Sequence, residues 1–160
     1  IGIILGLYIY QRKYNYKPLL WLLDRLSIPV SLGAFFVRIG NFFNSEIVGK
    51  YTGNNFGVIF INRGETLPRH PTQLYESFGY LILFLILNYF YKNRENNNGY
   101  LFGIFLSTMF TIRFIVEFLK ESQGGFESKL TLFSTGQWLS IPMILSGLFI
   151  IIYSFKKLKS

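Results

Sequence analysis

Long apolar runs, separated by shorter polar segments, organise this sequence. Four of them are long enough to cross the roughly 30 Å apolar core of a bilayer, and they cover residues 19–37, 74–91, 99–119 and 134–155. A shorter run, residues 1–10, indicates the end of a fifth helix, so we expect the chain to be the C-terminal part of a longer protein. The pattern predicts an all-α fold, a polytopic integral membrane helical bundle that forms a single membrane domain over residues 1–160.

The composition supports a membrane protein. The chain contains 18 Phe and 11 Tyr, and 51% of its residues are hydrophobic, which is more apolar surface than one small soluble domain would need to bury. Cysteine is absent, which excludes disulfides and thiolate metal sites. If the protein acts on a thiol, that thiol therefore belongs to the substrate. The sequence shows no cluster of metal ligands, and we expect neither a metal nor another cofactor.

The net charge of +8 comes from basic residues that lie mostly between the apolar runs. Lipid headgroups and topology explain this distribution better than nucleic acid does. The positive-inside rule assigns one set, with the C-terminus, to the cytoplasmic side: Arg12, Lys13, Lys17, Lys92, Arg94, Lys156, Lys157 and Lys159. We then expect residues 45–73, with a strand-like run at 56–61, and residues 120–132 to form a periplasmic loop region. That region holds Lys50, Arg63, Arg69, Lys120 and Lys129, balanced by Glu46, Glu65, Glu121 and Glu127.

Three arginines remain within or at the edge of apolar runs, where a charge costs about 2.5–3.5 kcal/mol on insertion scales. Arg25 has a structural explanation in its neighbour Asp24, or in snorkelling toward the interface. Arg38 ends its run just before Gly40 and Asn41, which favour a break in the helix.

On this topology Arg38 and Arg113 lie at the same depth near the outer surface. Two guanidinium groups that face inward there would form a site for a lipid phosphate. The alternative is that each arginine pairs with a carboxylate, and Glu117 lies on the same helical face as Arg113. The spacing is compatible with both interpretations.

His70 is the single histidine of the chain, and it precedes Pro71. Because proline is common in the first turn of a helix, His70 has a plausible structural role where that helix begins. The alternative is a role in proton transfer.

Four motifs, in this order, resemble those of the prolipoprotein diacylglyceryl transferase family. The first, GAFFVRIGNFFNSEIVG at residues 33–49, is highly specific for that family. The other three are RHPTQLYE at 69–76, RFIVEF at 113–118 and GQWLSIPM at 136–143. The resemblance covers nearly the whole chain.

This resemblance implies an enzyme of the bacterial inner (cytoplasmic) membrane. Such an enzyme transfers the diacylglyceryl group of phosphatidylglycerol to the lipobox cysteine of a prolipoprotein, which forms a thioether and releases glycerol phosphate. The implied partners are phosphatidylglycerol, the prolipoprotein signal peptide and membrane lipid. The residues implied at the active site are Arg38, Asn41, Glu46, His70, Arg113 and Glu117. The residues implied in substrate binding are Arg38, for phosphatidylglycerol, and Gly49 and Tyr75.

The family reaction predicts a division of labour between the two arginines. We expect Arg38 to anchor the phosphate and Arg113 to stabilise the negative charge that grows as the phosphate leaves. The attacking thiol needs a base, which is either His70 or a histidine that the family carries just upstream of residue 1. The chain also departs from some family members at Met109, where they have a tyrosine.

Two other functions fit a membrane bundle with buried arginines. A transporter or channel with an anion site would have broken helices and related halves, but the sequence contains no internal repeat. A non-catalytic scaffold would not bring Arg38, Asn41, Glu46 and Arg113 together.

Overall fold

A computed structural model describes residues 2–14, 18–93, 98–121 and 133–156 of the chain. Several residues of the predicted charge pattern lie outside these ranges: Lys17, Arg94, Glu127, Lys129, Lys157 and Lys159.

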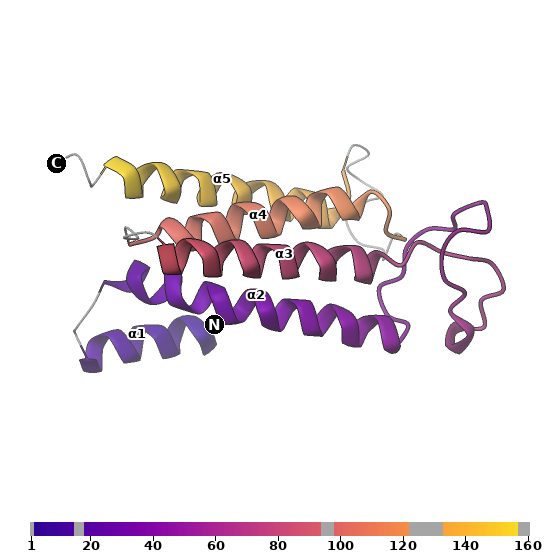
Figure 1. The fold of residues 1–160 in the computed structure, drawn as a ribbon, viewed down its shortest axis with the longest axis horizontal. Coiled ribbons are helices and arrows are strands. Elements are labelled where there is room, and N and C mark those ends of the chain that lie inside the picture. The colour runs from indigo at the N-terminus through magenta and orange to yellow at the C-terminus, as the bar shows by residue number, and fades with distance from the viewer. Residues whose placement is uncertain (1, 15–17, 94–97, 122–132, 157–160) are drawn as a thin grey trace.

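The described residues form five α-helices and one short 3-10 helix (Figure 1). Four of these helices are long and apolar enough to cross a membrane, so the predicted fold class, an all-α membrane bundle, is confirmed. The elements are α1 (Gly2–Tyr14), α2 (Leu19–Phe43), η1 (Ile61–Arg63), α3 (Thr72–Asn93), α4 (Tyr100–Glu117) and α5 (Thr135–Lys156).

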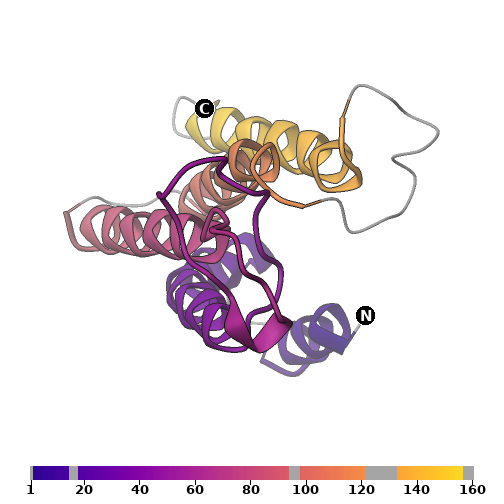
Figure 2. The ribbon, with the colours of Figure 1, turned by 90° about the vertical axis from the view of Figure 1, so that its right-hand side faces the viewer.

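The helices lie side by side along the long axis of the molecule, and an irregular loop region caps one end (Figures 1 and 2). The closest packing joins α4 to α5 and α2 to α3. Gly103 and Gly147 allow α4 and α5 to approach closely, since a Cβ atom on either glycine would contact the backbone of the other helix. The buried apolar cluster between α3 and α4 consists of Leu83, Leu87, Leu101 and Phe105.

A buried carboxylate joins α2 to the beginning of α4. Asp24 accepts hydrogen bonds from the backbone N–H groups of Gly99, at 2.7 Å, and Phe102, at 2.8 Å. It therefore satisfies donors that the first turn of a helix leaves unpaired. Arg25 instead lies over the ring of Trp21, 3.6 Å from its centre, and donates to the Trp21 carbonyl. Asp24 and Arg25 form no direct ion pair among the described residues, and they interact only electrostatically at longer range.

Two local predictions are also wrong. The helix does not break at Gly40 and Asn41, because α2 continues to Phe43 before it turns. The run 56–61 forms no strand: Val58 makes one isolated bridge with Arg69, and a 3-10 helix begins at Ile61. A strand needs several consecutive backbone pairs with a neighbour, and the described loop residues form only isolated bridges.

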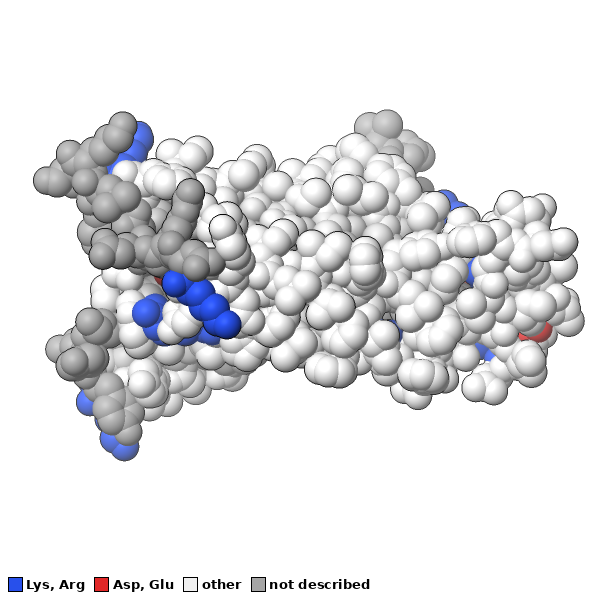
Figure 3. All heavy atoms as spheres, in the orientation of Figure 1, with Lys and Arg blue, Asp and Glu red and all other residues white. Residues whose placement is uncertain are grey.

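Charged side chains gather at the two ends of the molecule, and the middle of the face in Figure 3 carries none. The end opposite the loop region carries Arg12, Lys13, Lys92 and Lys156. The loop end mixes Lys and Arg with Glu. A neutral band between two charged ends is the distribution expected for helices that cross a bilayer.

Candidate active site

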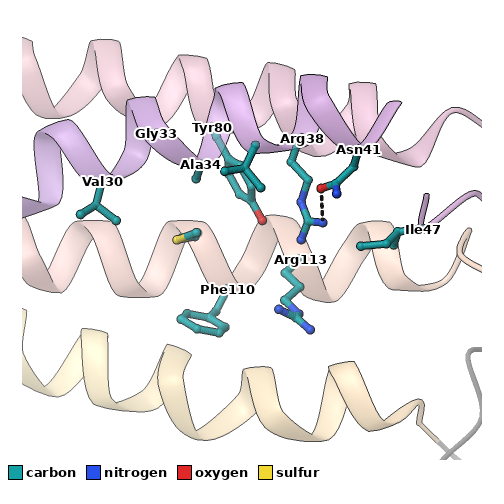
Figure 4. Close-up of a pocket in the computed structure, with 11 residues that line it drawn as sticks. Val30, Gly33, Ala34, Arg38, Asn41, Ile47, Tyr80, Phe110 and Arg113 are labelled. Atoms are coloured by element: carbon teal, nitrogen blue, oxygen red, sulfur yellow. Dashed lines mark hydrogen bonds between the residues drawn. The ribbon is translucent and has the colours of Figure 1, made fainter. Parts of the chain in front are cut away.

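A cavity of about 650 Å³ lies among α2, α3 and α4, near the loop end of the bundle. Arg38 from α2 and Arg113 from α4 both line it, and Figure 4 shows Arg38 with Asn41 beside it and Tyr80 near by. Apart from Tyr80, the rest of the lining is largely apolar: Val30, Gly33, Ala34, Val37, Ile47, Met109 and Phe110. The predicted convergence of Arg38 and Arg113 on one chamber is therefore present.

The unbroken course of α2 places these side chains on one face. Val30, Ala34, Val37 and Asn41 follow one another at three or four residues, the spacing that repeats along one side of a helix. The apolar members lie toward the middle of the span, and Arg38 and Asn41 toward the loop end (Figure 4). The cavity is thus amphipathic along its length, and a break at Gly40 would have turned Asn41 away from it.

Arg38, Asn41 and Glu46 form a chain of contacts. Arg38 Nη1 donates to Asn41 Oδ1 at 3.4 Å, and Asn41 Nδ2 donates to Glu46 Oε2 at 2.8 Å. The backbone carbonyl of Glu46 accepts from Gln73 Nε2 at 2.6 Å. Three residues from one predicted motif therefore meet, and Gln73 at the beginning of α3 holds the turn in place.

Two residues absent from the predicted site complete this network. Glu76 is fully buried; its Oε2 lies 2.8 Å from Arg38 Nε, and its Oε1 lies 2.8 Å from Lys120 Nζ. The signal that could have identified Glu76 is a carboxylate inside an apolar run, the counterpart of the arginines already noticed there. Removing one partner of such a buried pair costs about 3–5 kcal/mol, because the other charge is left uncompensated.

Arg113 does not pair with Glu117. Glu117 lies 3.3 Å from Lys120 Nζ and packs against α5 at Gly136, where any Cβ atom would overlap its carboxylate. Arg113 Nε is buried and has no hydrogen-bond partner, and no ion pair involves Arg113 among the described residues. The carboxylate alternative is therefore correct for Arg38, which pairs with Glu76, and wrong for the expected pair of Arg113 with Glu117.

Three other predicted residues, Gly49, His70 and Tyr75, do not line this cavity. Gly49 sits where the loop crosses two chain segments: its N–H donates to the His70 carbonyl at 3.0 Å, and a Cβ atom would collide with the His70 and Leu119 carbonyls. The ring of His70 lies 3.3 Å, Nδ1 to hydroxyl, from Tyr75. Gly49 thus has a packing role that the sequence does not reveal.

A second ionic cluster holds the loop region to the end of α4. The buried Arg69 guanidinium contacts Glu65 at 2.8 Å and Glu121 at 3.1 Å, and it lies 3.8 Å from the centre of the Tyr51 ring. The Tyr51 hydroxyl donates to Glu65 at 2.6 Å. The hydrogen bond from Tyr51 lowers the pKa of Glu65, and the nearby Arg69 guanidinium lowers it further. The same hydrogen bond raises the pKa of the Tyr51 hydroxyl.

The arrangement suits a ligand with an anionic head and an apolar body. Two guanidinium groups supply donors for a phosphate at one end of the cavity, and aliphatic and aromatic side chains line the rest. Because the chamber lies between apolar helices, its charges act through a low effective dielectric.

The chain is similar to known proteins of one family. The family model described as "Prolipoprotein diacylglyceryl transferase" matches residues 1–153. Three relatives carry the name phosphatidylglycerol–prolipoprotein diacylglyceryl transferase. The protein from Tolumonas auensis is 44% identical over 158 residues, which is 98% of this chain and 60% of the relative. Those from Bacteroides fragilis and Chloroherpeton thalassium are 41% and 42% identical over 98% of this chain, and 56% and 59% of their own lengths are covered. The chain therefore spans less than two thirds of these relatives.

Proposed function

Because the chain belongs to the prolipoprotein diacylglyceryl transferase family, we propose that the protein transfers a diacylglyceryl group from phosphatidylglycerol to a lipobox cysteine. The observation that carries this proposal is the amphipathic cavity lined by both Arg38 and Arg113. An anionic headgroup fits its polar end, and the glyceryl and acyl portions fit its apolar part.

The proposed reaction exchanges a carbon–oxygen bond for a carbon–sulfur bond. The cysteine sulfur attacks the glycerol carbon that carries the phosphate. The electron pair of the breaking bond moves to the phosphate oxygen, glycerol phosphate leaves, and the thiol proton passes to a base. The phosphate therefore gains a second negative charge as the bond breaks. Donors that bind the dianion more strongly than the monoanion lower the barrier.

The contacts support distinct roles for the polar residues. Arg38 is anchored by Glu76 and Asn41, as suits a residue that holds the headgroup in one place. Arg113 Nε has no hydrogen-bond partner, so its guanidinium keeps donor capacity for the growing charge. Asn41 and Glu46 orient Arg38. Glu117 acts at a distance, through Lys120.

Two candidates for the base are His70 and the histidine that members of the family carry just before the position of residue 1. The His70 ring lies beside Tyr75 and Phe56 and does not line the cavity. A role for His70 would therefore require the thiol to approach from the loop region. Tyr75 and Gly49 would then belong to the path of the peptide substrate.

The four apolar helices and the family make this a multi-pass bacterial membrane protein. We further propose that it resides in the inner membrane, with the C-terminus in the cytoplasm and the loop region in the periplasm. The positive-inside rule supports this orientation, because the described basic residues at the end opposite the loops have few acidic neighbours. The relatives are transferases by name, which favours the enzyme over a transporter or a scaffold.

The test is a transfer assay with phosphatidylglycerol and a lipobox peptide, using the full-length protein. We expect Arg38→Ala to lower the rate by about 10²–10³-fold, the usual effect of removing one charge-stabilising donor. Arg12→Ala is the matched control, since Arg12 contacts only the ring and hydroxyl of Tyr8 on α1 in the described residues. An unaltered rate in Arg38→Ala would contradict the proposed function.

A further inference from the structure

Glu76 holds an unusual position for a carboxylate. It is fully buried on α3, one turn from the beginning of the helix, and each of its oxygens faces a different cation. Oε2 lies 2.8 Å from Nε of Arg38 on α2, and Oε1 lies 2.8 Å from Nζ of Lys120, just after α4. One side chain therefore connects three segments that lie far apart in the sequence.

Glu76 contacts Arg38 through Nε, so the two terminal nitrogens of the guanidinium group remain available for other partners. Nη1 donates to Asn41, and the end of the fork reaches the cavity (Figure 4). Glu76 Oε2 accepts no well-aligned hydrogen bond despite its 2.8 Å distance. The contact is thus mainly electrostatic, and it depends on the charge of Glu76 rather than on its shape.

Lys120 compensates the other side of Glu76. Its side chain is 7% exposed and also lies 3.3 Å from Glu117. None of Glu76, Lys120 and Glu117 lines the cavity, whereas Arg38 and Arg113 do. The two carboxylates therefore lie outside the cavity lining, and the charged side chains in the lining itself are the positive Arg38 and Arg113.

We propose that Glu76 is a positioning residue that orients Arg38 toward the anion, and that Lys120 balances Glu76 so that its charge does not repel that anion. This inference rests on the proposed function, because it specifies how one arginine of the same site is held. It predicts that removing the charge of Glu76 lowers turnover without weakening binding, whereas removing the charge of Lys120 weakens binding.

The two charges can be removed separately. Glu76→Gln keeps the side-chain shape and removes a negative charge near the anion, so KM for phosphatidylglycerol should stay the same or fall. Turnover should nevertheless fall by about tenfold or more, because a misplaced catalytic group commonly costs up to about 10²-fold. Lys120→Met leaves Glu76 unbalanced, so KM should rise by about tenfold through the low local dielectric.

The matched control is Glu121→Gln. Glu121 also pairs with an arginine at the loop end of the molecule, at 3.1 Å from Arg69, but its carboxylate forms no ion pair with Arg38 or with the adjacent Lys120 among the described residues. Its kcat and KM should equal those of the unaltered protein. Unchanged turnover in Glu76→Gln would overturn the proposal. Losses of kcat and affinity that only follow the amount of folded protein would also overturn it, because they would show a purely structural role.

If Glu76→Gln fails to fold, the double variant Glu76→Gln/Lys120→Met removes both charges of the pair and should still lose turnover. A second measurement separates this inference from the proposed function. The rise in unfolding temperature with phosphatidylglycerol, relative to phosphatidylcholine, should persist in Glu76→Gln and disappear in Lys120→Met. If the unaltered protein shows that rise but no transfer, the proposed function fails. If the two variants respond alike to the lipid, the positioning role fails.

Discussion

Asp24 provides a test of the fold that does not depend on the proposed activity. Its side chain is 1% exposed, and its two oxygens accept from the N–H groups of Gly99 and Phe102 at the first turn of α4. Gly99 cannot cap that turn with a side chain of its own. A residue of α2 therefore supplies what an N-cap residue normally provides.

The cost of removing this carboxylate can be estimated from its contacts. Asp24→Ala leaves two N–H groups without partners, at about 1–3 kcal/mol each when they are buried. We therefore expect a loss of about 2–6 kcal/mol from the two unpaired groups, to which the lost attraction between the carboxylate and the helix dipole adds. Asp24→Asn keeps one acceptor oxygen and turns an NH₂ group toward the other N–H, so about half of that loss should remain. Either change is large against a total stability of about 5–15 kcal/mol.

The assay is equilibrium unfolding of the full-length protein in mixed micelles, followed by far-UV circular dichroism. Ser31→Ala is the matched control, because Ser31 is equally buried on α2 but bonds only to Ile28 of its own helix. If Asp24→Ala cost no more than Ser31→Ala, the capping of α4 by α2 would be refuted.

Three further predictions concern the site and the loop region. Arg113→Ala should abolish measurable transfer, and Arg113→Lys should rescue it only partly, because a lysine lacks the planar fork of donors; the lipobox transfer assay measures both. Gly49→Ala should loosen the loop region, since a Cβ atom would collide with the backbone carbonyls of His70 and Leu119; protease sensitivity of residues 45–71 measures this. The pKa of Glu65 is lowered from its ordinary value of 4.5 by the Tyr51 hydroxyl and by Arg69. Its contribution to loop stability is therefore complete above pH 4.5 and is lost as the pH falls through the lowered pKa, which proteolysis at decreasing pH should reveal.

Each of these predictions has a result that would contradict it. Full activity in Arg113→Ala would remove that arginine from the reaction. Unchanged protease resistance in Gly49→Ala would mean that the crossing of chain segments is looser than the contacts indicate. Glu65→Gln should lose the acid sensitivity contributed by this carboxyl, and an identical pH profile in that variant would assign the transition to another group.

The membrane class and the positions of the charged groups follow from the sequence for simple reasons. An apolar run of about 20 residues has few stable alternatives to a membrane helix, because its backbone groups must be satisfied internally. An arginine such as Arg38 or Arg113 inside such a run is costly enough to stand out. Local pattern therefore identifies the helices and the two arginines that line the cavity.

Partner choice is a different matter, because it depends on which side chains the packing brings together. Spacing pairs Arg113 with Glu117 and Asp24 with Arg25, whereas in the structure Glu117 lies beside Lys120, three residues further along the chain, and Asp24 binds the beginning of α4. The contact of Asp24 with α4, like that of Glu76 with Arg38, joins separate elements, and such distances are set by how the helices pack.

The sequence by itself therefore determines a helical membrane protein with two conspicuous arginines near one end, since hydrophobicity and the cost of burying charge act locally along the chain. Only the tertiary structure decides that Glu76 and Lys120 lie behind Arg38, that Gly49 is a crossing point and that His70 lies outside the cavity. These features depend on distances between segments 20 to 80 residues apart, which helix packing and the path of the loop region fix.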